Sequence, residues 1–197
     1  MTCWVLKCDI RKFFANIDHN ILKKILEKYI VDENLLWLLG DIIESFRSRP
    51  MVGLPLGNLT SQLLINIYMN EFDQFMKHGL KAEYYMRYSD DFIILSEDRD
   101  WLLGALVKIK DFLDIKLKLE LHPDKVSIKT LSSGVDFLGW VNFPEHRVLR
   151  TSTKKRMFNN IRLKNGKIEI VKSYLGLLSH GNTSKLQEAV RVVVGSL

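Results

Sequence analysis

Cysteine is scarce in this 197-residue chain, and long apolar runs, internal repeats and low-complexity tracts are absent. Its two cysteines, Cys3 and Cys8, have no neighbouring histidine, so the sequence offers neither a zinc-binding pattern nor a disulfide framework. Their odd spacing in a predicted strand turns them to opposite faces, and we expect two reduced thiols that serve packing. No apolar segment reaches the length of a membrane span and no secretory pattern is present, which predicts a cytoplasmic protein without a membrane partner.

The net charge of +6 is concentrated in one segment. Residues 147–172 hold nine Lys or Arg and one acidic residue, a local charge of +8, so the remainder carries −2 (6 − 8). Such a basic run predicts contacts with nucleic-acid phosphates, with a solvated helix face as the alternative. The residues that we expect to bind nucleic acid are Arg147, Arg150, Lys154, Lys155, Arg156 and Arg162.

The hydrophobic pattern predicts an α+β fold. With 47% hydrophobic residues the chain can bury a substantial core. We expect strands over residues 3–10, 84–88, 92–95 and 126–128, helices over 19–30, 33–46, 60–78 and 99–113, and a hairpin carrying 135–140 and 147–149. This order is that of a ferredoxin-like split βαβ sheet with helices on one face. We expect one domain over residues 1–150 and a basic helical appendage over 151–197.

Three carboxylates stand where predicted strands end. Asp9 closes the first strand, and Asp90 and Asp91 lie at the tip of the hairpin that follows. Like charges crowd together only where a cation neutralises them, and Mg²⁺ with oxygen ligands is the commonest cation in that role. Two such ions about 4 Å apart can activate an attacking hydroxyl and stabilise a leaving pyrophosphate, which predicts phosphoryl transfer. Singly, each aspartate is more often a helix cap or a turn former.

Four segments in series resemble the palm of a reverse transcriptase, an RNA-directed DNA polymerase. They are Asp9-Ile10-Arg11-Lys12-Phe13-Phe14, the stretch from Gly53 to Gln62, Tyr88-Ser89-Asp90-Asp91 and Phe137-Leu138-Gly139-Trp140. The resemblance implies a palm followed by a partial helical thumb. It also implies two Mg²⁺ ions, with Mn²⁺ as an alternative, and as partners an RNA template, a DNA or RNA primer and deoxynucleoside triphosphates.

The resemblance implies a role for each matching residue. Asp9 and Asp90 would hold the metal ions with the Ile10 carbonyl, and Asp91 would support them. Lys125 would protonate the leaving pyrophosphate, although a loop lysine is usually only solvated. Phe14 would exclude a ribose 2′-hydroxyl, with core packing as its alternative. The nucleotide would further meet Leu56, Gly57 and Gln62, and the primer grip would be formed by Phe137, Leu138, Gly139 and Trp140, whose aromatic rings are otherwise core.

Two departures from the family pattern bear on the expected subtype and on the expected activity of the chain. Many members have Gln-Gly-x-x-x-Ser-Pro where this chain has Leu56 to Gln62, and this variant resembles diversity-generating retroelement enzymes. That subtype implies error-prone copying opposite adenine and a small basic accessory protein; group II intron-type enzymes are the runner-up. No fingers region precedes the first catalytic strand, so a catalytically idle RNA-binding fragment is the alternative function. A nucleotide cyclase, which shares the palm architecture, is disfavoured because its Gly-Gly-Asp/Glu-Glu-Phe turn is missing.

Overall fold

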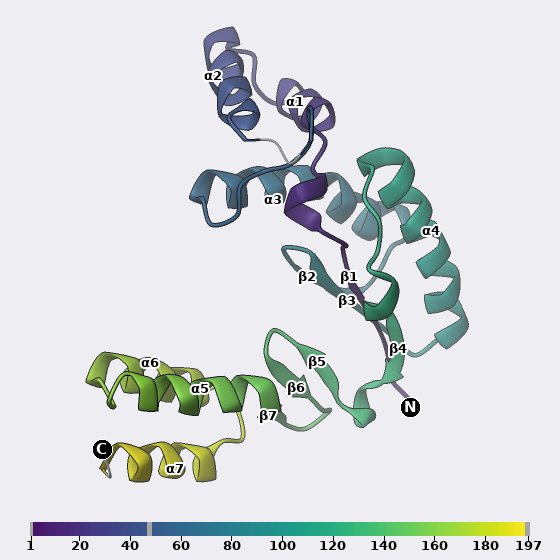
Figure 1. Cartoon of the computed structure of the whole chain (residues 1–197). Coiled ribbons are helices and arrows are strands. Elements are labelled where there is room, and N and C mark those ends of the chain that lie inside the picture. Colours follow the sequence, from purple (N-terminus) through teal and green to yellow (C-terminus); the bar gives the residue numbers. More distant parts are fainter. Residues whose placement is uncertain (1, 47–48, 196–197) are drawn as a thin grey trace. The chain divides into compact units, whose positions relative to one another are not determined.

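The computed structural model describes residues 2–46 and 49–195, without the side chain of Val194. Figure 1 shows the chain in sequence colours. It contains two compact units, essentially Cys3–Ile128 and Lys129–Leu197. The functional division after residue 150 stays a prediction, because compactness alone does not define a functional boundary.

A four-stranded sheet forms the centre of the N-terminal unit. Its strands are β1 (Trp4–Asp9), β2 (Tyr84–Tyr88), β3 (Asp91–Ser96) and β4 (Ser127–Thr130), in the order β2-β3-β1-β4. Strand β3 pairs antiparallel with both β1 and β2. This is the predicted split βαβ order, and the expected α+β class is confirmed.

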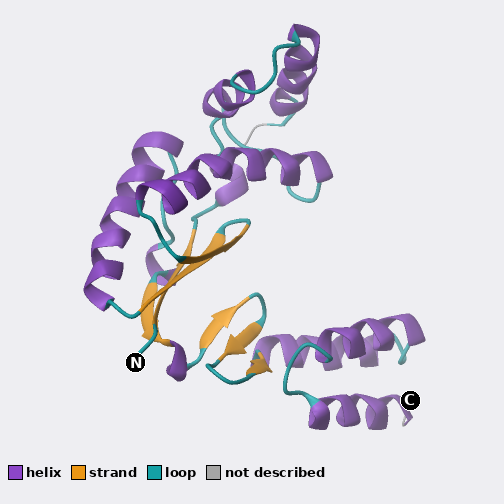
Figure 2. Cartoon of the chain, turned by 180° about the vertical axis from the view of Figure 1, so that it is seen from behind, coloured by secondary structure: helices purple, strands orange, loops and turns teal. Residues whose placement is uncertain are grey.

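The N-terminal unit contains the helices α1 (His19–Glu27), α2 (Glu33–Glu44), α3 (Leu59–Gln74) and α4 (Arg99–Leu117). Helix α1 packs against α2 and α3 rather than against the strands, as Figure 1 shows. Helices α3 and α4, which connect the strands, lie on the same side of the sheet in Figure 2. One core unites alternate strand residues, such as Leu6 and Phe92, with Tyr68 and Phe72 of α3. The Tyr68 hydroxyl donates to the Leu117 carbonyl at 2.7 Å and so joins α3 to the end of α4.

Aspartates begin three of these helices, which explains why the sequence placed the helix starts well. Asp18, Asp32 and Asp98 each accept hydrogen bonds from main-chain N–H groups in the first turn of the helix that follows. The predicted ends were less accurate. Helix α4 continues four residues past Leu113 because its stop is Lys118, which adopts a left-handed conformation (φ 50°). A single π-helical turn, Phe75–Gly79, extends α3.

The C-terminal unit has a small sheet and its own core. Strands β5 (Val135–Phe137), β6 (Trp140–Asn142) and β7 (Arg147–Leu149) pair antiparallel in that order, and helices α5 (Thr151–Leu163), α6 (Ile168–Leu178) and α7 (Ser184–Gly195) follow. The predicted hairpin therefore has one more strand than the sequence indicated, because the chain reverses at Leu138-Gly139. Both turn residues have positive φ, 52° and 85°. Trp140 and Leu149 pack with helical residues such as Met157 and Leu178.

Both cysteines are free thiols, as expected. Cys8 on β1 is fully buried, and this burial raises the pKa of its thiol to about 12. Cys3 is half-buried rather than buried. Across residues 2–46 and 49–195, no helix combines the length and the apolar character needed to cross a membrane. The cytoplasmic location stays a prediction.

Candidate active site

The fold brings the three predicted carboxylates together. Asp9 and Asp91 are directly opposite each other in the β1–β3 pair, so both side chains lie on one face of the sheet. Asp90 occupies the turn beside them, where its carbonyl accepts a hydrogen bond from the Ile10 N–H at 3.1 Å. Residues more than 80 positions apart in sequence thus meet at one edge of the sheet. The side chains of Asp9 and Asp91 are only 13% and 26% exposed.

Crowding makes the ionised form of these acids costly. Burial, with the neighbouring Asp9 charge adding to it, raises the pKa of both Asp90 and Asp91. Lysines partly offset this effect by lowering the same pKa values. An approaching divalent cation would remove the repulsion, so the electrostatics favour cation binding.

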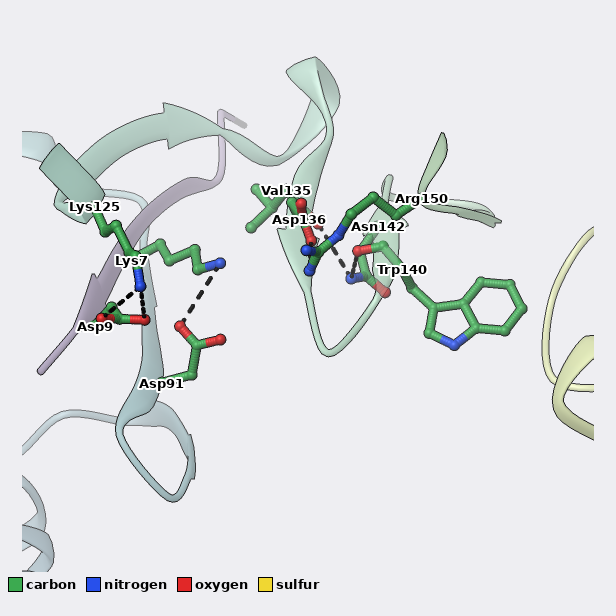
Figure 3. A network of polar contacts seen from close by, with 9 residues as sticks. All are labelled: Lys7, Asp9, Asp91, Lys125, Val135, Asp136, Trp140, Asn142 and Arg150. Atoms are coloured by element: carbon green, nitrogen blue, oxygen red, sulfur yellow. Dashed lines mark hydrogen bonds and ion pairs between the residues drawn. The ribbon is translucent and has the colours of Figure 1, made fainter. Parts of the chain in front are cut away.

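Two lysines contact the acids, as Figure 3 shows. The Lys125 Nζ donates to both carboxylate oxygens of Asp9, at 3.0 and 2.9 Å. This contact depends on the short turn Pro123–Lys125, which follows a 2.7 Å hydrogen bond from the His122 N–H to the Asp9 carbonyl. The Lys7 Nζ lies 3.7 Å from Oδ1 of Asp91. The hydrogen bond to Asp9 raises the pKa of Lys125, whose side chain is half exposed and remains charged.

The donor set fits a hard divalent cation. In the described part of the chain, no three His, Cys, Asp or Glu side chains are already arranged to hold a metal ion. The carboxylates of Asp9, Asp90 and Asp91 nevertheless supply only oxygen ligands, which Mg²⁺ prefers. Oδ1 of Asp91 is buried and accepts no hydrogen bond. Lys7, 3.7 Å away, offsets its charge without a hydrogen bond, and a divalent cation at this edge would give the oxygen a direct ligand contact.

Main-chain hydrogen bonds join the Phe14 segment to the glycine-containing loop. The Leu54 N–H donates to the Phe14 carbonyl, and the Gly53 N–H to the Ile17 carbonyl, both at 2.8 Å. The buried His19 ring contacts the Gly53 carbonyl through Nε2 at 2.7 Å. Gly53 has φ 108°, a conformation that L side chains rarely adopt, so glycine is needed there. The segment after Asp9 and the loop that begins at Gly53, about forty residues apart in the sequence, are therefore held together by main-chain hydrogen bonds.

The predicted nucleotide contacts remain accessible. Phe13 is buried (2% exposed), whereas Phe14 is only partly buried and presents its ring edge-on to Phe13 at 5.7 Å. Phe13 is therefore a core residue, whereas Phe14 packs against the core and keeps part of its ring exposed. Leu56 is 79% exposed, and Gly57 (φ 91°) has open space around the position of a Cβ. Gln62 is exposed in the first turn of α3.

The predicted primer-grip residues divide into core and turn. Phe137 and Trp140 are buried, as the alternative interpretation of these aromatics expected. Leu138 is half exposed at the turn, and the Gly139 carbonyl accepts a hydrogen bond from the Arg150 N–H at 3.0 Å. The backbone and Leu138, rather than the aromatic rings, are what this hairpin offers to a ligand.

The six predicted nucleic-acid-binding residues also divide into two groups. Arg147 donates through Nε to the His180 carbonyl and lies over the Trp140 ring, 5.2 Å from its centroid. Arg150 forms a 2.6 Å ion pair with Asp136, visible in Figure 3. Both therefore serve the C-terminal unit itself. The other four, Lys154, Lys155, Arg156 and Arg162, are exposed on α5.

Sequence reasoning missed two cations. Lys7 lies 3.7 Å from Asp91, and Arg87 donates a hydrogen bond to the Ser89 carbonyl in the turn before Asp90. The alternation of β1 did place Lys7 on the Asp9 side, so a signal was available. The partner of Arg87 is Asp73 on α3, and no local pattern connects these two residues.

The chain is similar to several known proteins. A family model described as "Reverse transcriptase (RNA-dependent DNA polymerase)" matches residues 1–141. Protein YkfC of Escherichia coli is 26% identical over 77% of this chain and 48% of its own length. The group II intron-encoded protein LtrA of Lactococcus lactis is 27% identical over 85% of this chain and 39% of its own length. The chain thus spans less than half of these curated relatives.

Solved structures share the fold. Telomerase from Candida tropicalis, in complex with a fragment of telomeric RNA, superimposes with a TM-score of 0.62 at 13% identity, over 98% of this chain and 38% of its own. The foamy viral protease-reverse transcriptase, in complex with an RNA/DNA hybrid, has a TM-score of 0.52 at 16% identity, over 98% and 24% of the two chains. Since the family model covers more than two thirds of the residues, the chain belongs to the reverse transcriptase family.

Proposed function

We propose that this chain is the palm and the beginning of the thumb of an RNA-directed DNA polymerase that uses two metal ions. The observation that carries the proposal is the register of β1 and β3, which sets Asp9 opposite Asp91 and hydrogen-bonds Ile10 to Asp90. Membership of the reverse transcriptase family supports the same conclusion. As proposed, residues up to 150 act as palm and residues 151–197 as thumb.

Each residue of the site has a proposed task. Asp9, Asp90 and Asp91, with the Ile10 carbonyl, hold the ions, preferably Mg²⁺ and alternatively Mn²⁺. When bound, such ions lower the pKa of a primer 3′-hydroxyl and stabilise the charge on a leaving pyrophosphate. The charged Lys125 holds a proton at Nζ beside Asp9, within the site where a leaving group needs one. Phe14 excludes a ribose 2′-hydroxyl from the nucleotide pocket.

The proposed partners are an RNA template, a DNA or RNA primer and deoxynucleoside triphosphates. Two structural neighbours were solved with RNA or with an RNA/DNA hybrid, which supports this choice. We assign phosphate contacts mainly to the exposed cations of α5, because Arg147 and Arg150 are already engaged. A small basic accessory protein belongs to the proposal only if the enzyme is of the diversity-generating type.

The subtype turns on Leu56. A group II intron-encoded protein is among the relatives, which favours the runner-up, whereas the exposed Leu56 fits the error-prone subtype. Replacing Leu56 with Gln leaves the core untouched. If the diversity-generating subtype is right, misincorporation opposite template adenine decreases in this variant when products are sequenced; an unchanged error spectrum supports the intron type.

Primer extension tests the proposed activity. Wild-type protein with Mg²⁺ or Mn²⁺ should incorporate labelled deoxynucleotides on a primed RNA template, and Asp90→Asn should lower the rate by about 10²-fold or more. Asp111→Asn on the exposed side of α4 removes the same charge elsewhere and should have no effect. If wild-type protein binds the RNA but does not extend the primer, the binding-only function is supported instead.

A further inference from the structure

Arg87 is a buried cation next to the catalytic turn. It lies on β2, where exposure alternates: Tyr84, Met86 and Tyr88 are exposed, while Tyr85 and Arg87 turn toward the helices. The Arg87 side chain is only 9% exposed. A guanidinium remains charged at any physiological pH, so burial at this level requires partners for most of its N–H groups.

Helix α3 supplies most of these partners. Arg87 donates to Asp73 through Nε at 2.8 Å and through a terminal nitrogen at 2.6 Å, a two-pronged contact with one carboxylate. The Tyr85 hydroxyl donates to the same carboxylate at 2.7 Å, and Asn66 lies 3.4 Å from the other terminal nitrogen. This geometry fixes the plane of the guanidinium, which a lysine ammonium could not reproduce.

The remaining hydrogen bond of Arg87 reaches the turn that carries the acids. The terminal nitrogen Nη1 of Arg87, which also lies near Asn66, donates to the Ser89 carbonyl at 3.1 Å. Ser89 has φ 57°, a left-handed conformation that is unfavourable for residues other than glycine. The next residue, Asp90, accepts the Ile10 N–H. A continuous set of contacts therefore runs from α3, through Arg87 and Ser89, to the main chain of Asp90, the residue whose carboxylate the proposed mechanism uses.

We propose that Arg87 is a positioning residue: by holding the Ser89 carbonyl, it fixes the turn so that Asp90 is preorganised beside Asp9 for a divalent cation. This inference rests on the proposed function, which supplies the divalent cation that Asp9 and Asp90 would bind. These contacts stabilise a backbone conformation that is otherwise unfavourable at Ser89, at the end of an edge strand. Arg87 itself touches no reacting group, and its effect passes entirely through the turn.

The test uses Arg87→Lys in the whole chain, with Arg191→Lys as a control that makes the same change at an exposed position of α7. Mn²⁺ affinity, measured from the electron paramagnetic resonance signal of the free ion, should fall about 10–100-fold in Arg87→Lys only. In metal-free protein, hydrogen exchange of the Ile10 amide should accelerate about tenfold or more, since that amide depends on the turn. Circular dichroism checks that both variants fold.

Each outcome decides the inference. A folded Arg87→Lys protein with wild-type Mn²⁺ affinity and wild-type exchange at Ile10 overturns it. If Arg87→Lys does not fold, Asp73→Asn serves as the second variant: it weakens the guanidinium's anchor, so faster exchange at Ile10 supports the inference and unchanged exchange overturns it. Wild-type protein that neither binds Mn²⁺ nor extends a primer overturns the proposed function instead, and the exchange comparison still decides whether Arg87 holds the turn.

Discussion

The two units hold their hairpins in different ways. In the N-terminal unit, the β2–β3 hairpin is surrounded by charges that pair with one another: Arg87 with Asp73, Lys7 with Asp91 and Lys125 with Asp9. In the C-terminal unit, the β5–β6 hairpin has one such pair, Arg150 with Asp136, and Trp140 packs against helical residues. Charge pairs give directional control of a few atoms, whereas packing gives stability without such control. The comparison teaches that charge pairs are more numerous around the hairpin that carries Asp90 and Asp91, the proposed metal ligands.

The largest expected effect breaks the packing of the C-terminal hairpin. A Cβ added at Gly181 would lie 2.2 Å from the Trp140 ring and 3.1 Å from the Arg147 carbonyl. Gly181→Ala should therefore lower the free energy of unfolding of the C-terminal unit by about 2–3 kcal/mol. Urea unfolding, with hydrogen exchange to locate the change in α5–α7, measures this.

Gly176→Ala is the matched control. Nothing lies within 4 Å of the corresponding position on α6, and alanine is the better helix former. This variant should be neutral or slightly stabilising. Equal stability of Gly181→Ala and wild-type protein would show that Trp140 does not depend on this close contact.

The next effect tests the polar support of the N-terminal unit. Asp18 caps α1 and accepts a 2.6 Å hydrogen bond from Lys118. Burial alone would raise the pKa of Asp18, but Lys118 and the N–H of Ile21 lower it overall. Asp18→Asn keeps a capping side chain and removes only the charge, so we expect a loss of about 1–2 kcal/mol at neutral pH.

The pH dependence of this loss has a definite sign. Because the folded pKa lies below the ordinary value of 3.8, the stabilisation is fully present above that value and disappears as the pH falls through the folded pKa. Urea unfolding of wild-type and Asp18→Asn proteins should therefore differ at pH 7 and converge in stronger acid. A difference that persists in strong acid would contradict the charge-based explanation.

The smallest expected effect compares the two turns directly. Leu138 and Ser89 both have positive φ without being glycine, 52° and 57°. Replacing either with Gly relieves backbone strain, and the greater flexibility of the unfolded chain offsets part of the gain, leaving about 0.5 kcal/mol or less. Only Ser89→Gly should also weaken Mn²⁺ binding, because only that turn carries a proposed metal-binding carboxylate, Asp90. Equal Mn²⁺ affinity of the two variants would remove this distinction.

Much of the fold could be predicted from local patterns. Alternation in β1, and aromatic and β-branched residues on both sides of Ser89-Asp90-Asp91, indicated strands that meet the acids, and Asp18 marked a helix start because a carboxylate is a good partner for free N–H groups. The site was predictable for the same reason, since strand ends and the hairpin turn limited where Asp9 and Asp90 could go.

Contacts between distant residues could not be predicted in this way. Arg87 looks like an ordinary exposed residue of an alternating strand, and only the path of α3 brings Asp73 to it. The turn at Leu138-Gly139 has no local signal at Leu138, because leucine rarely adopts positive φ, and the sequence therefore predicts one continuous segment over residues 135–140. Patterns tell which face a side chain occupies, whereas partners depend on packing across the whole unit.

Cys8 can serve as a reporter of strand β1. Its thiol immediately precedes Asp9 and, with no exposed surface and a pKa raised to about 12, cannot react with an alkylating reagent while β1 is paired. The half-buried Cys3, near the start of the same strand, supplies an internal reference for reagent access. The labelling rate of Cys8 relative to Cys3 therefore reports how often the strand beneath the acids opens.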